Sequence, residues 1–475
     1  MLFNRSDRHR SCRLARPIRS LVLCATLGLG ALPAQATEPL RLSPVATLQL
    51  GGESLANGDA RTALFLANAY LDNIGESFLA RFLQARAAGE LGTWDTALIG
   101  AKRAYALAST DGERRNSARL AGRAAAKLDR NFSSKIWLRR AFQNSATPFE
   151  KARDLADFRI IDARDPITRH ISFGIAPNSN INNGAQSPAL TIDGYPDLGW
   201  EISNTGQALS GTTASIDAAL GFQIARRERT RLSLGVHGAT RLNRLSKSAR
   251  ALAPMAKGSD FDTSLLGLRF DLVHLLALGA QPYQISLYTD ASTQNFGHRP
   301  YKTALTVGGQ VQTRVGTATQ GLAASLSRET AQRADTPARF VLRASPFVAV
   351  KQPGGTLTVT ANVEQVRSAA RAQQSFLAGG SVSFDLAENI GPLHLRFGVA
   401  AYRRETPHYA QFPFGEIEGG RSDMTTSAQI NATFSDTSYY GFSPELGLVY
   451  RHTNSNVSRY DTSEIGLGLS FRSAF

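Results

Sequence analysis

The segment that decides the fold is Ser215-Ile216-Asp217-Ala218-Ala219-Leu220-Gly221-Phe222-Gln223-Ile224, in which apolar residues alternate with polar or small ones. A period of two indicates a β-strand with one apolar face and one polar face. The same period recurs from about residue 170 onward, for example between Leu393 and Val399. The second part of the chain is therefore predicted to be a series of similar strands.

Fourteen such segments follow one another, most of them 10 to 13 residues long. They cover residues 169–177, 213–225, 230–242, 261–272, 282–293, 302–313, 319–328, 338–350, 355–366, 374–386, 392–403, 422–434, 441–452 and 463–475. An even number of strands of this length suits a transmembrane barrel with lipid outside and water inside. The alternative is a large soluble β-sandwich or solenoid, in which the apolar face forms an internal core.

The connections between these segments alternate in length. Several that follow odd-numbered segments are long, namely residues 178–212, 243–260 and 404–421, whereas most that follow even-numbered ones are tight, such as residues 226–229. Outer-membrane barrels have short periplasmic turns and longer outer loops. The pattern therefore predicts that the part preceding the barrel lies in the periplasm.

The first 36 residues have the features of a secretory signal peptide. Six arginines precede an apolar run from Leu21 to Leu32, and Ala34-Gln35-Ala36 provides a small-x-small cleavage site. Both cysteines of the chain, Cys12 and Cys24, lie in this leader. The mature chain is therefore expected to have no disulfide, no thiol catalysis and no cysteine-based metal site.

The chain is basic, with a formal net charge of +15. An exported protein does not meet nucleic acid, so the expected counterions are anionic lipid, lipopolysaccharide or an acidic partner.

Residues 45–141 show a helical period and an internal repeat. Gly58 and Gly92 are 34 residues apart, and so are residues 62–67 and 96–101, which is the spacing of tetratricopeptide repeats. A degenerate third unit follows, with Leu128 and Phe132 in the places of Leu91 and Trp94. An ordinary helical bundle with accidental similarity is the alternative.

The predicted plan is a signal peptide over residues 1–36, a tetratricopeptide-like helical domain over 37–150, a linker over 151–167 and a β-barrel over 168–475. No metal spacing, cofactor motif or catalytic motif stands out. His170 and Ser172 share one strand face, as a Ser–His hydrolase would need, but lumen-lining polar residues are the favoured interpretation. We therefore predict a protein that is not an enzyme.

The last strand has apolar residues at alternate positions. They are Leu467, Leu469, Phe471 and, at the end of the chain, Phe475. Such a strand resembles the signal that the barrel assembly machinery reads, although Ser473 stands where an aromatic residue is usual.

A polar segment leaves the first strand: Asn178-Ser179-Asn180-Ile181-Asn182-Asn183. Its side-chain amides can tie the backbone of a loop. In this position it resembles the opening motif of the surface lipoprotein assembly modulator family, the translocators of the type XI secretion system. The region from Gly441 to Asp461 is similar to the last hairpin of that family, and the resemblance covers residues 37–475.

The resemblance implies an outer-membrane translocator, active as a monomer, that delivers periplasmic client proteins to the cell surface. Those clients are lipoproteins or secreted haem-binding proteins. Aromatic residues of the helical domain would bind the client, namely Tyr70, Phe82, Trp94, Tyr105 and Trp137, unless they form the core of the hairpins. A polysaccharide exporter and a passive porin are the competing interpretations.

Overall fold

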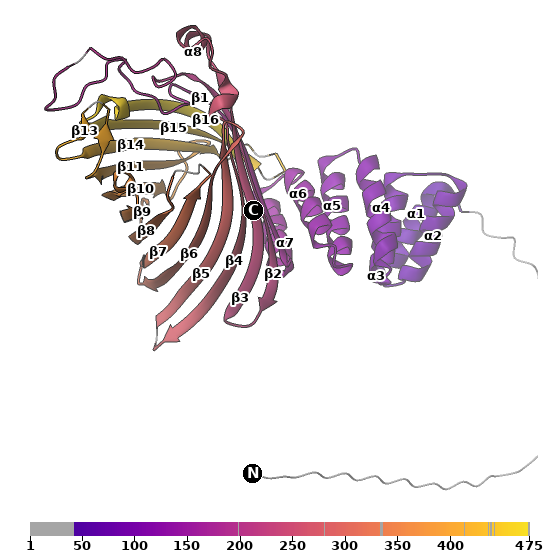
Figure 1. Ribbon diagram of the computed structural model, residues 1–475. Coiled ribbons are helices and arrows are strands. Elements are labelled where there is room, and N and C mark those ends of the chain that lie inside the picture. Colours follow the sequence, from indigo (N-terminus) through magenta and orange to yellow (C-terminus); the bar gives the residue numbers. More distant parts are fainter. Residues whose placement is uncertain are drawn as a thin grey trace, which may run out of the picture.

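The computed structural model describes residues 42–473, except residues 198, 280, 333–335, 413, 436, 438 and 441. A stack of helices is followed by a closed barrel of strands (Figure 1). The predicted signal peptide and Phe475 lie outside the described residues. Within the described residues, every helix is too short or too polar to cross a bilayer.

Helical hairpins form the N-terminal part. The helices are α1 (Pro44–Ala56), α2 (Ala60–Asn73), α3 (Phe78–Glu90), α4 (Trp94–Leu107), α5 (Asp111–Lys127), α6 (Asn131–Gln143) and α7 (Pro148–Arg164). Gly58, Gly92 and Asp129 turn the chain within successive hairpins, each at a left-handed φ of +85°, +77° and +55°. The predicted repeat is therefore confirmed, and its degenerate third unit is the hairpin α5–α6.

Small residues let the helices of this stack approach closely. A Cβ added at Gly100 would lie only 3.1 Å from the Cβ of Ala85 in the preceding helix. Alanines dominate the main core cluster, which contains Ala85, Ala88, Ala97, Ala101, Ala118, Ala121, Ala124 and Ala125. The small residues that define the repeat are therefore contact residues between helices.

Helix α7 replaces most of the predicted linker over residues 151–167. Its start is fixed by a capping box between Thr147 and Glu150. Its buried Asp154 accepts hydrogen bonds from Arg115 at 3.0 Å and from Ser145 at 2.8 Å. Phe158 packs with the core beside it. The segment is rich in charged residues, which in the sequence suggests a solvated linker. In the structure some of these charges form buried ion pairs that attach the helix to the domain.

Fourteen antiparallel strands close into the barrel. They are β1 (Ile167–Asn178), β2 (Gly211–Arg226), β3 (Thr230–Leu245), β4 (Thr263–Leu278), β5 (Gln281–Phe296), β6 (Arg299–Val315), β7 (Ala318–Ala331), β8 (Arg339–Gln352), β9 (Gly355–Ser368), β10 (Ser375–Leu386), β11 (Leu393–Thr406), β14 (Arg421–Phe434), β15 (Phe442–Ser455) and β16 (Thr462–Ser473). Each pairs with its sequence neighbours, and β1 pairs with β16. All fourteen predicted strands are present.

Apolar side chains cover the outside of the barrel. Val399 is 58% exposed, Leu268 55% and Leu326 51%, and large apolar residues at alternate positions of the other strands are exposed in the same way. A closed sheet pairs its backbone groups internally, so such a surface is stable in lipid and unfavourable in water. The predicted membrane-facing surface therefore lies where the period of two places it.

The two ends of the barrel differ. Turns of two or three residues join β2 to β3, β6 to β7 and β8 to β9, whereas long connections at the other end follow β1, β3 and β11. These carry α8 (Lys247–Leu252), the 3-10 turn η1 (Gly258–Phe261) and the small pair β12 (Ala410–Gln411) and β13 (Gly415–Glu416). At the same end, the shorter connections β9–β10 and β15–β16 carry the 3-10 turns η2 (Arg371–Gln373) and η3 (Ser458–Tyr460). The connection β5–β6 departs from the pattern: it is a tight turn at Gly297 and His298, both with positive φ.

Candidate functional site

One side of the helical stack carries an open cavity of about 650 Å³. Helices α3, α5 and α7 provide most of its lining, because alternate helices of such a stack face the same side. Its large apolar lining residues are Phe82, Leu120, Leu138, Ile160 and Ile161. Ile160 is 53% exposed, so part of this apolar surface is open to solvent.

Cations surround this apolar lining, and we call the whole the basic groove. It contains Arg86, Arg119, Arg123, Lys127, Arg153 and Arg164 but only one carboxylate, Asp157. Asp157 pairs with Arg119, which also contacts Asp154, and burial lowers the pKa of Arg119. For the other five cations, no carboxylate partner exists among the residues that the structure describes. The groove therefore has unbalanced positive charge.

The five aromatic residues expected to bind a client lie in different surroundings. Phe82 lines the basic groove. Trp137 is only 7% exposed and packs edge-to-face with Tyr105, at a centroid distance of 5.3 Å. Trp94 packs against the alanine core, with Arg123 and Lys127 of the groove over its ring. Tyr70 is half-buried in the C-terminal turn of α2.

The helical domain contacts the barrel at the end with the short turns. Lys135 of α6 pairs with Asp165 at 2.8 Å, and Asp165 pairs with Arg169 of β1 at 3.0 Å. Arg139 donates a hydrogen bond to the carbonyl of Tyr440, in the β14–β15 turn, at 3.1 Å. The guanidinium of Arg226, at the end of β2, donates to the carbonyl of residue 163 at 2.7 Å. In Figure 1, α6 and α7 lie nearest the barrel and α1 and α2 farthest from it.

Polar side chains line the interior of the barrel. His237 and Asp290 are 2.6 Å apart, Arg343 pairs with Glu364 at 2.7 Å, and Ser172 lies 3.5 Å from Asp217. In an antiparallel sheet, directly opposed residues lie on the same face. The β1–β2 register pairs Ser172 with Asp217, so Ser172 lies on the same inner face as Asp217.

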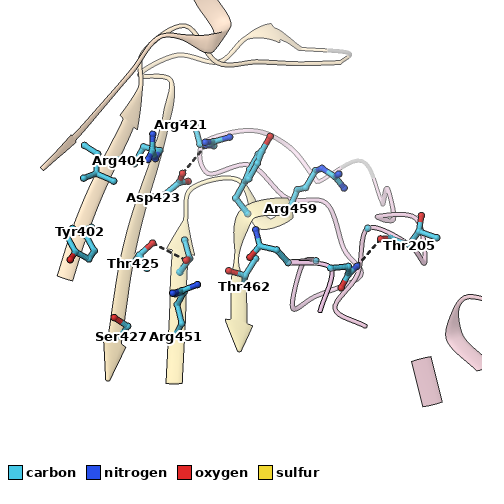
Figure 2. Close-up of a pocket in the computed structure, with 17 residues that line it drawn as sticks. Thr205, Tyr402, Arg404, Arg421, Asp423, Thr425, Ser427, Arg451, Arg459 and Thr462 are labelled. Carbon is cyan, nitrogen blue, oxygen red and sulfur yellow. Dashed lines mark hydrogen bonds and ion pairs between the residues drawn. The ribbon is translucent and has the colours of Figure 1, made fainter. Parts of the chain in front are cut away.

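An arginine-rich cavity of about 600 Å³ lies inside the barrel near the long connections, and we call it the outer cavity (Figure 2). Its arginines are Arg404 of β11, Arg421 of β14, Arg451 of β15 and Arg459 of η3. Residues 182–184 and 205–206, from the β1–β2 connection, complete the lining. This connection therefore folds over the lumen.

The segment Asn178–Asn183 fastens this connection to the last strand. Ser179 exchanges two hydrogen bonds with Ile465, through its backbone N–H at 3.0 Å and its hydroxyl at 2.8 Å. Asn180 is only 4% exposed, and its side chain bonds both the N–H and the carbonyl of Gly184. Asn182 donates to the carbonyl of Gln207 at 2.7 Å. The amides tie the backbone as the sequence predicts.

The long connections pack on one another through small apolar clusters. Ile192, Tyr409, Ile417 and Val457 form one cluster, with residues from three different connections. Leu209 packs with Leu245 and Ala249 in a second cluster. The end of the barrel with the long connections therefore carries a folded cap.

The arginines of the basic groove and of the outer cavity are not identifiable from the sequence alone. They come from separate helices and strands, and only the packing of the helices and the register of the strands bring them together. One signal is present in the sequence: Arg404, Arg421 and Arg451 each occupy the polar phase of an alternating strand.

Comparisons with known proteins find resemblance of fold only. No protein-family model and no curated protein matches the chain. The first TPR domain of the human RPAP3 protein is 17% identical over 26% of this chain and 93% of its own, with a TM-score of 0.23. OprB of Pseudomonas putida is 10% identical over 67% of this chain and 97% of its own (TM-score 0.38).

CdiB of Acinetobacter baumannii is 8% identical over 65% of this chain and 60% of its own, with a TM-score of 0.33. At these identities and TM-scores the likenesses carry no argument about function, and the fold assignment stands on the helix pairing and strand order. The chain joins a tetratricopeptide-like helical domain to a closed barrel of fourteen antiparallel strands.

Proposed function

We propose that this chain is an outer-membrane translocator that delivers client proteins from the periplasm to the cell surface. The clients are surface lipoproteins or secreted proteins of the haem-binding type. One observation carries the proposal: an open basic groove lies on a helical domain that is fixed to the short-turn end of a polar-lined barrel. A passive porin admits solutes by diffusion and does not need a periplasmic binding domain of this kind.

The proposal places the helical domain in the periplasm and the outer cavity at the cell surface. It includes assembly by the barrel assembly machinery, contact with outer-membrane lipid and lipopolysaccharide, and action as a monomer without a cofactor. The helical domain captures the client, and the barrel provides the route. Binding and conduction are sufficient for this task, so the proposal includes no catalytic step and no nucleic-acid partner.

The basic groove gives the client site a stated chemistry. Its apolar lining suits apolar side chains of an extended segment, and its unpaired cations suit carboxylates placed beside them. We therefore expect the captured segment of the client to be acidic and amphipathic.

The test is surface display of an exported protein encoded beside this chain, measured by protease shaving of intact cells. Arg86→Glu with Arg123→Glu reverses two charges of the groove and is expected to abolish display. Lys102→Glu with Arg103→Glu makes the same change on exposed positions of α4, outside the groove, and is expected to leave display intact. Full display with the groove variant, in a barrel that assembles normally, would contradict the proposal.

A further inference from the structure

The outer cavity concentrates positive charge in the lumen. Its lining contains Arg404, Arg421, Arg451 and Arg459 but only one carboxylate, Asp423. A neighbouring cavity of about 490 Å³ shares Arg404 and Arg421 and adds Arg339, Arg343 and one carboxylate, Glu364, to the same wall. Side chains of one sign in a narrow passage with low-dielectric walls focus the field and raise the local concentration of counterions.

Several of these guanidinium groups are held in place by contacts within the protein. Arg421 pairs with Asp423 at 3.1 Å and stacks on Tyr460 at 3.7 Å from the ring centroid. Arg404 is fixed between Glu364 and Ser375, each at 3.0 Å. Side chains held in this way lose little conformational entropy when a ligand binds.

Arg459 and Arg451 have the donor capacity that remains. Within the described residues Arg459 has no hydrogen bond or ion pair, and its Nη1 lies so close to Gly206 that a Cβ there would be only 2.7 Å away. Arg451 has one long contact, 3.5 Å to Glu464, and is 53% exposed. Figure 2 shows Arg451 and Arg459 among the residues that line the cavity, together with Thr462.

The rest of the lining suits oxygen-rich anions. Hydroxyl groups come from Tyr402, Thr425, Ser427, Thr453 and Thr462. Hydroxyls donate to oxyanions, and guanidinium groups bind carboxylate and phosphate in a bidentate geometry. A cation would meet three more arginines than carboxylates on this lining.

We propose that the outer cavity binds small anions carrying carboxylate or phosphate groups, and that it makes the outer end of the lumen selective for anions. This activity is independent of client delivery. It would let small anionic solutes enter the barrel, while the closed cap prevents proteins from passing through the lumen.

The first measurement is isothermal titration of the purified full chain with inorganic phosphate and, separately, with succinate. Binding of either anion with a millimolar or tighter Kd supports the proposal, and the arm that binds identifies the preferred group. Arg451→Gln with Arg459→Gln is expected to weaken binding by about ten- to a hundredfold, the range for losing charge-assisted hydrogen bonds. Absence of binding in both arms would overturn the proposal.

The second measurement is the reversal potential of single barrels in planar bilayers under a potassium chloride gradient. The unaltered chain is expected to favour chloride, and the double variant is expected to lose most of that preference. Arg241→Gln removes an arginine of β3 that is outside the cavity lining and is expected to have a small effect. An equal effect of Arg241→Gln would show a general lumen charge and refute a local site.

A conservative variant keeps the test decisive if the double variant folds poorly. Arg451→Lys retains the charge but loses the bidentate geometry. It is expected to weaken binding of phosphate or succinate while preserving chloride preference. Unchanged binding by this variant would contradict a role for the guanidinium of Arg451.

Discussion

At the scale of single residues, the side-chain amide of Asn180 joins the β1–β2 connection to the last strand. It is buried and hydrogen-bonds both backbone groups of Gly184, and in a third hydrogen bond its Nδ2 donates to the carbonyl of Ser463 at 3.3 Å. A buried polar group that loses its partner costs more free energy than the bond itself contributes. This side chain therefore helps to hold the β1–β2 connection against β16, together with the hydrogen bonds between Ser179 and Ile465.

We predict that Asn180→Ala destabilises the closed position of residues 179–210 by about 1–3 kcal/mol, because the Gly184 groups lose their partner. Native-state proteolysis of that connection measures the opening free energy. Asn183→Gly is the matched control, since Asn183 is exposed and has a φ of +51° that glycine adopts easily. Equal protease resistance of Asn180→Ala and the unaltered chain would show that the amide is not the fastening group.

At the scale of elements, α7 is attached by charge as well as by apolar contact. Asp154 has no exposed side-chain surface, and Arg115, which faces it, is also buried. Removing one partner of such a pair leaves an uncompensated buried charge. The sequence of α7 is polar because of this arrangement, and the helix still belongs to the folded domain.

We predict that Asp154→Ala destabilises the helical domain by about 3–5 kcal/mol, because Arg115 and Arg119 lose their buried carboxylate. Urea unfolding followed through the helical circular-dichroism signal measures the change. Arg159→Ala, on the exposed side of the same helix, is expected to stay within about 0.5 kcal/mol of the parent. Similar losses in the two variants would mean that α7 is not anchored through Asp154.

The barrel strands permit an equally sharp test of which side chains face lipid and which face the lumen. Val399 lies near the middle of β11 on the outer face, and the next residue, Ala400, lies on the inner face. Val399→Arg is expected to destabilise the barrel by about 2–4 kcal/mol in lipid, whereas Ala400→Arg is expected to be far milder. Unfolding in vesicles compares them, and the reverse order would mean that the two faces are exchanged.

At the scale of the whole molecule, the junction between helices and barrel depends on the charge of Asp165. Burial disfavours its carboxylate, but hydrogen bonds from Lys135, from the Ile167 backbone N–H and from Arg169 outweigh burial and lower its pKa. A lowered pKa contributes stability above the ordinary value of 3.8, and that stability is lost as the pH falls through the folded value. The junction is therefore sensitive to acid and insensitive to changes near neutrality.

We predict that hydrogen exchange at the end of α7 and the start of β1 rises as the pH is lowered from neutral to below 3.8, after correction for the intrinsic rate. The reason is protonation of Asp165, which removes its attraction to Lys135 and Arg169. Asp165→Asn is expected to exchange faster already at neutral pH and to lose this pH dependence. A pH profile shared by both proteins would assign the effect to another group.

Much of this architecture can be predicted from the sequence, because two periods dominate it. The alternation of apolar residues identifies all fourteen strands, although β4 continues to Leu278, six residues beyond its predicted end. Periodicity loses its signal at that end because residues 275–278 are apolar at successive positions, so alternation no longer marks the strand. The arginines of the outer cavity could not be predicted together, because Arg404 and Arg459 become neighbours only through strand register and loop packing.

The cap is held together by contacts between its connections. Ile192 belongs to one connection, Tyr409 and Ile417 to a second and Val457 to a third, and they share one small core. Displacing any one of these connections exposes the apolar surface of the others, so the cap opens cooperatively or stays shut. On the proposed function, cargo larger than a small solute supplies the free energy of that opening, and molecules of that size do not pass through the resting barrel.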